Sequence, residues 1–326
     1  KQERQLRPYQ ESLKQEIYEH YRKGVKSVLV IASGGLGKAQ PLHSKILTPG
    51  GFKLMGEIQA GDLVTSASGG FCRVTGVFPQ GEKEIYRIYF GDGSSTLCCD
   101  DHLWNIQSYD MVRSGGADSW ATMPLSEIRE TYIRYRKKND RVPNGKEMRY
   151  RVPLVKPVEF FPVKEPLPIN PYALGLMLGD GSFAGNNITF SCPDTQLQES
   201  LESLSPKPCN LRNTGWNGGI DFRVVGENYF NPTLIAIRSM GLGGCKSEDK
   251  FIPEMYKLAS VEDRLAILQG LLDTDGFAAG SSCIEYTTVS LALADDVKFI
   301  VNSLGGTVSV STKTPRYSYA GQKKTG

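Results

Sequence analysis

The apolar positions form two different patterns along the chain. Between residues 44 and 104 they form short runs at 45–48, 61–64, 73–77 and 84–90, separated by glycine, proline and aspartate. Short runs with turn residues between them are typical of β-strands joined by tight turns, so we expect an all-β region. Further upstream, a helical pattern at 11–23 precedes a continuous apolar run at 27–31, which is typical of a buried parallel strand.

The second half of the chain contains two longer apolar segments, 171–181 and 268–276, that repeat one pattern. Each has small residues four positions apart, and each ends in aspartate followed by glycine. Small residues on one face let two helices approach closely, so we expect these helices to pair and to bring Asp180 and Asp275 together at one end. Two adjacent carboxylates suit Mg²⁺-dependent phosphodiester cleavage. A helix that simply ends at a glycine cap explains one motif, but it explains a repeated pair poorly.

Composition narrows the class of protein. The 326 residues exceed one typical domain, and 40% hydrophobic with 22% charged residues is ordinary for a globular protein. The start of the chain is charged and no run is long enough to span a membrane, so we expect a cytoplasmic, intracellular protein without a membrane partner. The seven cysteines show no C-x-x-C spacing, which argues against a zinc site or a disulfide framework.

A glycine loop follows the first predicted strand. Strand, glycines and then lysine is the arrangement that cradles phosphate groups. The segment resembles the nucleotide-binding start of superfamily 2 helicases, which implies nucleotide-binding roles for Gln10, Gly34, Gly35, Gly37 and Lys38. The motif then breaks, because position 39 is Ala where a Mg²⁺-binding Ser or Thr is expected. We interpret residues 1–38 as a helicase fragment whose loop is interrupted.

The interrupting region resembles inteins. Residues 46–53 and 58–64 are similar to the N-terminal intein block, and residues 96–104 are similar to the block that carries the splicing histidine. The resemblance implies a splice junction at Lys38/Ala39, with His102 donating to the departing nitrogen of that peptide. In the second block Cys99 stands where a Thr is usual, and we expect it to support splicing.

Ala39 restricts the splicing mechanism, because a methyl group cannot attack the upstream carbonyl. Three explanations stay open: an engineered change, a decayed element, or a class 3 intein, which lacks a nucleophile at its first position. Trp104 lies two residues after His102, as in class 3 inteins, and favours that reading. The nucleophile would come from a later intein block, and the sequence up to Gly326 does not contain that block. We therefore expect this chain to need a C-terminal intein and extein segment, and not to splice alone.

The aspartate repeat resembles the two-repeat LAGLIDADG homing endonucleases found inside inteins. The resemblance implies Mg²⁺ held by Asp180 and Asp275, a metal- or water-positioning role for Lys250, and double-stranded DNA from the uninterrupted helicase gene as the target. From sequence alone Lys250 would be placed at the surface. Strands at 187–191, 220–225 and 283–288 would contact DNA. We expect Arg223 to contact DNA, together with the residues of a basic run: Arg134, Arg136, Lys137 and Lys138. The alternative for the basic run is an exposed, solvated surface.

The predicted fold is multidomain. A short α/β helicase fragment (1–38) is followed by an all-β splicing region of the Hint type (39–155). An α+β endonuclease (156–326) then has αββαββ repeats at about 166–258 and 262–326, the second truncated, which makes nuclease activity of this chain doubtful. We expect a monomer that is a homing endonuclease and an autocatalytic splicing element. The alternatives are a LAGLIDADG protein that binds DNA without cleaving it, and an ATP-dependent DNA helicase fragment.

Overall fold

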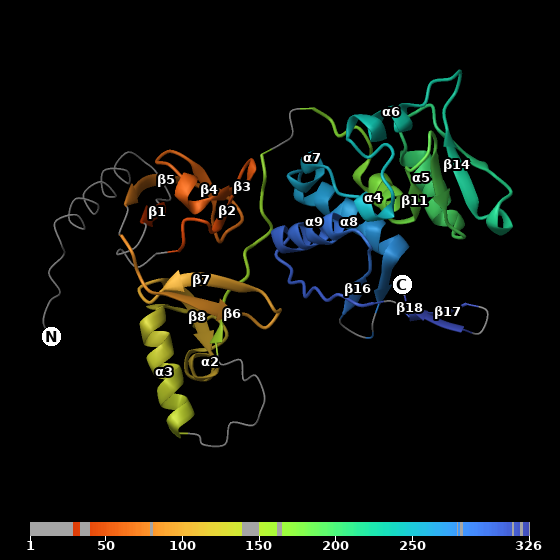
Figure 1. The fold of residues 1–326 in the computed structure, drawn as a ribbon. Coiled ribbons are helices and arrows are strands. Elements are labelled where there is room, and N and C mark those ends of the chain that lie inside the picture. The colour runs from red at the N-terminus through yellow and green to blue at the C-terminus, as the bar shows by residue number, and fades with distance from the viewer. Residues whose placement is uncertain are drawn as a thin grey trace, which may run out of the picture. The chain divides into compact units, whose positions relative to one another are not determined.

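The computed structural model describes residues 29–32, 40–78, 81–138, 150–161, 165–278, 280, 283–314, 316–319 and 322–325. The predicted helix at 11–23 and the glycine loop lie outside these residues. The chain divides into two compact units (Figure 1): one is built mainly from residues 42–77 with 154–306, and the other mainly from residues 78–153 with 307–326. These units group the chain differently from the predicted domains, whose boundaries at 38/39 and 155/156 stay predictions.

Short strands are the main secondary structure of residues 40–124, as the turn-rich pattern predicts. They pair antiparallel as neighbours along the chain: β2 with β3, β4 with β5, β6 with β7 and β8 with β9. Strands β1 and β10 join β5 and β8 respectively. The bounds are β1 Leu29–Ala32, β2 Lys45–Thr48, β3 Gly51–Leu54, β4 Leu63–Thr65, β5 Phe71–Phe78, β6 Ile85–Tyr89, β7 Ser95–Cys99, β8 Leu103–Ser108, β9 Ala121–Pro124 and β10 Tyr150–Arg151.

Two helices also lie in this stretch, α2 (Tyr109–Gly115) and α3 (Leu125–Lys138), so the region is not purely β. Helix α3 contains the basic run at 134–138 that the sequence singled out. It forms because Leu125 and Ile128 recur at helical spacing and turn toward the protein, while charged residues occupy the other faces.

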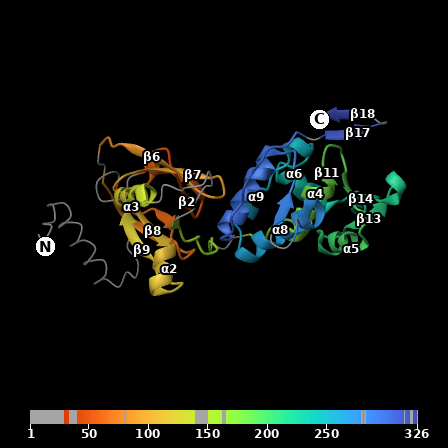
Figure 2. The same ribbon diagram turned by 90° about the horizontal axis from the view of Figure 1, so that it is seen from below.

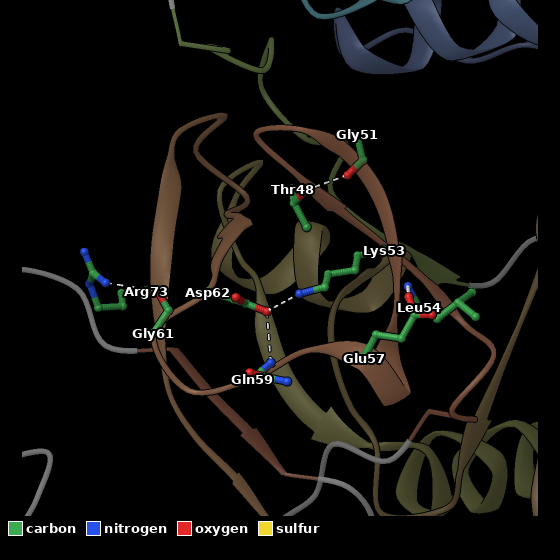
Figure 3. A network of polar contacts seen from close by, with 9 residues as sticks. All are labelled: Thr48, Gly51, Lys53, Leu54, Glu57, Gln59, Gly61, Asp62 and Arg73. Carbon is green, nitrogen blue, oxygen red and sulfur yellow. Dashed lines mark hydrogen bonds and ion pairs between the residues drawn. The ribbon is translucent and has the colours of Figure 1, made fainter.

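Polar contacts fix the turns between β2 and β5 (Figure 3). The Lys53 ammonium donates to Asp62 at 2.8 Å, and the backbone N–H of Gln59 donates to the same carboxylate at 2.9 Å. The Lys53 hydrogen bond holds the pKa of Asp62 below its usual value. Arg73 donates to the Gly61 carbonyl at 3.0 Å. The segment that resembles the N-terminal intein block is therefore tied to the neighbouring strands by side chains.

The second half of the chain contains two αββαββ sequences of elements. The first is α4 (Pro171–Asp180), β11 (Gly181–Ser182), β12 (Ile188–Ser191), α5 (Thr195–Leu204), β13 (Asn210–Asn213) and β14 (Asp221–Val225), followed by α6 (Pro232–Ser239) and α7 (Glu254–Lys257). The second is α8 (Val261–Asp275), β15 (Gly276–Ala278), β16 (Ile284–Tyr286), α9 (Leu291–Ser303), β17 (Arg316–Tyr319) and β18 (Gln322–Thr325).

The strands of the two repeats are organised differently. The first repeat forms a four-stranded antiparallel sheet in the order β11-β12-β14-β13, whereas the second forms the separate pairs β15-β16 and β17-β18. One core cluster joins both repeats and includes Leu174, Phe190, Val224, Leu271 and Ile300, all buried. Among the described residues, no helix has the length and apolar character needed to cross a membrane.

Within the first unit, the strands at 42–77 contact the helical part directly. The rings of Phe52 and Phe299 lie 5.6 Å apart, edge to face, and the Glu159 N–H donates to the Gly69 carbonyl at 2.9 Å. Arg264 of α8 is fully buried and donates to the Val158 carbonyl and to the Ser303 hydroxyl. Residues 154–160 therefore link these strands to the helices.

Candidate functional site

Helices α4 and α8 lie side by side in both views (Figures 1 and 2). Their contact depends on the small residues that the sequence analysis singled out. A Cβ atom added at Gly175 would lie 3.0 Å from the Gly270 Cα, and one added at Gly270 would lie 2.8 Å from the Leu176 nitrogen. Both positions thus require glycine, and the predicted close helix pairing is present.

The paired helices end together at the two aspartates. Asp180 is the last residue of α4 and Asp275 the last of α8. A Cβ atom added at Gly179 would clash with the Thr274 Oγ1 and lie 3.4 Å from the Asp275 Oδ2, so glycine at this position lets the end of α8 lie against the end of α4. The arrangement that the repeat predicts, two carboxylates from two helices at one end, is what the structure contains.

The environment opposes ionisation of both carboxyl groups. Burial raises the pKa of Asp180, and the neighbouring Asp275 carboxylate raises it further. Partial loss of water raises the pKa of Asp275, although the residue keeps an exposed surface. The Lys250 ammonium lowers both pKa values. Two crowded carboxylates held this way favour a bound cation.

Lys250 is buried, with only 4% of its surface exposed, so the expectation of a surface lysine is wrong. Its Nζ donates to the carbonyls of Leu178 at 2.7 Å, Gly179 at 3.0 Å and Gly181 at 2.7 Å. An ammonium has three N–H donors, and these three carbonyls account for all of them. Lys250 therefore caps the C-terminal end of α4, where the helix leaves carbonyls without partners. Burial lowers its pKa.

Two side chains beside the aspartates were not among the predicted site residues. Cys192 is buried directly after β12, where its thiol lowers the pKa of Asp180, while burial raises the pKa of the thiol itself. Tyr286 of β16 lies near Asp275, and burial first and that carboxylate second raise the pKa of its phenol. The antiparallel pairings Gly181–Phe190 and Gly276–Tyr286 place these segments equivalently in the two repeats. The spacing of the helix motifs gave no signal for either residue.

The carboxylate pair can hold a metal ion only together with ligands from outside the protein. Within the described part of the chain, no group of three or more His, Cys, Asp or Glu side chains is arranged to hold a metal. A cation at Asp180 and Asp275 would take hard carboxylate oxygens and leave its remaining positions to water or phosphate oxygens, which is the coordination that Mg²⁺ prefers. These residues fit Mg²⁺.

The sheet face opposite the core carries the predicted Arg223 and a second arginine. Arg223 of β14 is exposed and pairs in register with Arg212 of β13, which is also exposed. Strand β13 was not predicted, and Arg212 was missed with it. The predicted Arg134, Arg136, Lys137 and Lys138 lie on α3, but their side chains are outside the description.

The predicted splicing residues lie in the other unit, around the turn between β7 and β8. The His102 N–H donates to the Cys99 carbonyl at 3.1 Å, and the His102 carbonyl accepts from the Leu125 N–H at 2.9 Å. The rings of His102 and Trp104 lie 5.3 Å apart, edge to face. Cys99 is buried at the end of β7. The structure thus brings His102, Cys99 and Trp104 together.

An ion pair that the sequence analysis missed holds the same turn. One guanidinium nitrogen of Arg129, on α3, donates to both Asp100 carboxylate oxygens, at 2.6 and 2.8 Å, and the Arg129 guanidinium also lies over the Tyr86 ring. The junction Lys38/Ala39 and the nucleotide-binding positions Gln10, Gly34, Gly35 and Gly37 lie outside the described residues.

Comparison with known proteins agrees with this geometry. Residues 262–324 match a family model described as a LAGLIDADG-like domain. The replicative DNA helicase DnaB of Mycobacterium intracellulare is 27% identical over 300 residues, which are 89% of this chain and 46% of that protein. The chain thus spans about half the length of this curated relative.

Two crystal structures of the gp41-1 intein, one of them of a substituted variant, are 31% and 32% identical to this chain. Each match includes 27% of this chain and 58% of the intein chain, and the TM-scores are 0.22 and 0.21. These scores are too low to support an overall fold.

The family match shows a LAGLIDADG-like domain at residues 262–324, which contains most of α8 and its terminal Asp275. More particularly, this match and the similarity to a DnaB helicase agree with the expectation of a LAGLIDADG endonuclease inserted in a helicase.

Proposed function

We propose that this chain is a homing endonuclease that cleaves both strands of the uninterrupted helicase gene in a Mg²⁺-dependent reaction. The observation that carries the proposal is the meeting of Asp180 and Asp275 at the joined ends of α4 and α8. A protein that only binds DNA gains nothing from two carboxylates whose ionisation the surroundings oppose. Negative charge at this point would instead repel the phosphates, unless a cation lies between them.

The chain's own residues have distinct tasks in this proposal. Asp180 and Asp275 hold the cation, and the rigid helix pair fixes the distance between them. A bound Mg²⁺ would polarise a DNA phosphate and lower the pKa of an attacking water. Lys250 acts as a positioning residue, because its donors are occupied by carbonyls next to Asp180. Its positive charge offsets part of the repulsion between the carboxylates.

Cleavage of a duplex that carries the uninterrupted helicase sequence tests this proposal. The changes D180N and D275N should each abolish cutting while leaving DNA binding in place, whereas D295N on the exposed face of α9 should leave cutting unchanged. Retained cutting in either active-site variant would favour a different catalytic centre. Binding without cutting by the unchanged protein would favour the DNA-binding alternative.

A second activity, protein splicing at Lys38/Ala39, is favoured by the braced turn at His102. We propose that His102 donates a proton to the nitrogen leaving at this junction, and that Trp104 orients its ring by edge-to-face contact. Since Ala39 offers no nucleophile, the attack on Lys38 comes from another residue, as in class 3 inteins. The helicase-fragment alternative predicts nucleotide binding by the interrupted loop before splicing, and absence of such binding would exclude it.

Splicing is tested in cells by expressing the gene with its natural flanking sequence and following the ligated helicase on gels. H102A should slow cleavage at the upstream junction by about 10²–10⁴-fold, which is the usual contribution of a positioned acid. A change at His43, which lies outside this turn, serves as the histidine control. Unchanged splicing in H102A would remove His102 from the mechanism.

A further inference from the structure

A row of polar side chains crosses the four-stranded sheet of the first repeat. The register pairs Ser182 with Thr189, Thr189 with Arg223, and Arg223 with Arg212, so these residues follow one another across β11, β12, β14 and β13. Residues that pair directly across neighbouring antiparallel strands point to the same face of the sheet. The four side chains therefore share one face.

The neighbouring row shows that this face is directed away from the core. Ile188 pairs with Val224, and Val224 with Leu211; the first two are buried and the third packs against the same core cluster. Because side chains alternate along a strand, the row with Arg223 faces the other way. Arg212 and Arg223 are accordingly exposed.

Two arginines directly opposite one another repel, and such a pair lowers the stability of the sheet. Among the ion pairs and hydrogen bonds of the described residues, no carboxylate compensates either guanidinium. A protein keeps an uncompensated pair of this kind at a cost in stability, so a polyanion is the partner that would make the pair favourable.

We infer that Arg212 and Arg223 read two guanines in the major groove of one half of the DNA target. This inference rests on the proposed function, which supplies DNA as the partner, and adds the bases that are read. A two-stranded ribbon such as β13–β14 fits the major groove, and a guanidinium binds the paired acceptors O6 and N7 of guanine with two donors. Neighbouring strands are about 4.8 Å apart, so the two arginines address separate bases.

The same guanidinium groups also suit phosphate oxygens, and the two targets differ in their consequences. A contact to guanine fixes sequence, whereas a contact to phosphate strengthens binding to every sequence and adds to its salt dependence. Strand β14 lies inside the sheet, between β12 and β13, so Arg223 has sheet neighbours on both sides. The Thr189 hydroxyl next to it can serve a further base.

The test is selection of bound duplexes from a randomised library by the full chain, without Mg²⁺. The unchanged protein should enrich sites with two fixed guanines. R223Q and R212Q should each lose one of these preferences, by about 5- to 150-fold against other bases. R223K keeps the charge but not the two-donor geometry, and should lose the same preference. R238Q on α6 is the control and should leave both guanines fixed.

Several outcomes decide between the readings. If R223Q and R212Q weaken all sequences equally and reduce the salt dependence, the arginines bind phosphate and the inference is overturned. If R223K still selects guanine as strongly as the unchanged protein, bidentate reading is overturned. If the unchanged protein selects a site with two arginine-dependent guanines but does not cut it with Mg²⁺, the inference stands and the proposed nuclease fails. Circular dichroism of each variant verifies folding.

Discussion

The carboxyl groups at the joined helix ends lie where their own charge is unfavourable. Asp180 and Asp275 both have raised pKa values, from loss of water first and, for Asp180, from the facing carboxylate second. Lys250 compensates only in part, because its donors are held by backbone carbonyls. Functional groups of this kind are often kept at the expense of stability.

The change D180N should therefore stabilise the protein at neutral pH. A carboxyl group whose pKa is raised on folding contributes stability below its unfolded pKa and loses it as the pH rises through the folded pKa. Asn carries no charge to be penalised, so D180N should melt at a higher temperature at pH 7, by about 2–4 °C for each kcal/mol gained. The difference should vanish below about pH 4. A lower melting temperature for D180N at pH 7 would contradict this account.

Removing the Lys250 ammonium should have the opposite effect. K250M leaves three buried carbonyls without donors and takes away the positive charge beside two carboxylates, so we expect a loss of about 3–5 kcal/mol in the free energy of unfolding. Denaturant unfolding measures it. The exposed Lys246 is the matched control, and K246M should stay within about 0.5 kcal/mol. Equal stability of the two variants would show that the cap is not needed.

The helix pair is the element on which the site depends, and glycine is what lets it form. Gly175 and Gly270 face each other where α4 and α8 cross, with no room for a methyl group on either. The Tyr172 hydroxyl also donates to Asp273 at 2.7 Å and links the first turn of α4 to the last turn of α8. The position of both aspartates therefore follows from backbone contact between the two helices.

A methyl group at this contact should separate the helices. G270A places a Cβ 2.8 Å from the Leu176 nitrogen, which backbone cannot accommodate without moving, and we expect a loss of about 1–3 kcal/mol together with weaker Mg²⁺ binding. Calorimetry with Mg²⁺ and denaturant unfolding measure both effects. At Gly185 the nearest atom to an added Cβ is 4.0 Å away, so G185A is the control. Unchanged Mg²⁺ binding in G270A would show that the metal site does not depend on the close contact between the two helices.

The sequence predicted this element because its signal is local and repeated. Small residues four apart, followed by Asp-Gly, indicate a close helix pair without any knowledge of the rest of the fold. Strand β13 gives no such signal: Asn210–Asn213 contains one apolar residue, and only its pairing with β14 identifies it. Arg212 was missed for that reason. The burial of Lys250 depends on contacts about 70 residues distant, which no spacing rule conveys.

At the scale of the whole molecule, the strands at 42–77 and the helices at 154–306 share a compact unit. Arg264 is central to this, since it joins residues 154–160 to α8 and α9, and the same segment donates to the carbonyls of Ala67 and Gly69 through Lys156 and Glu159. The predicted boundary at 155/156 falls inside this connecting segment. The pattern of apolar positions indicated the change from short strands to longer helices, but it could not show which segments pack together.

Replacing Arg264 should loosen more than its own helix. R264M removes the donors to Val158 and Ser303, so we expect faster amide exchange at residues 156–160 and also at 67–71. Hydrogen exchange with mass spectrometry resolves both segments. The exposed Arg238 provides the comparison, and R238M should leave exchange at 67–71 unchanged. Faster exchange confined to α8 and α9 would mean that the strands do not depend on this connection.

We propose above that the protein cuts the uninterrupted helicase gene with Asp180 and Asp275, which lie at the ends of the paired helices. Its most direct measurement is cleavage of a plasmid that carries that gene by the purified protein in Mg²⁺, beside D180N, D275N and D295N. The account predicts a double-strand break at one site with the unchanged protein and D295N, and none with D180N or D275N. Cutting by D180N or D275N at the rate of the unchanged protein would contradict it.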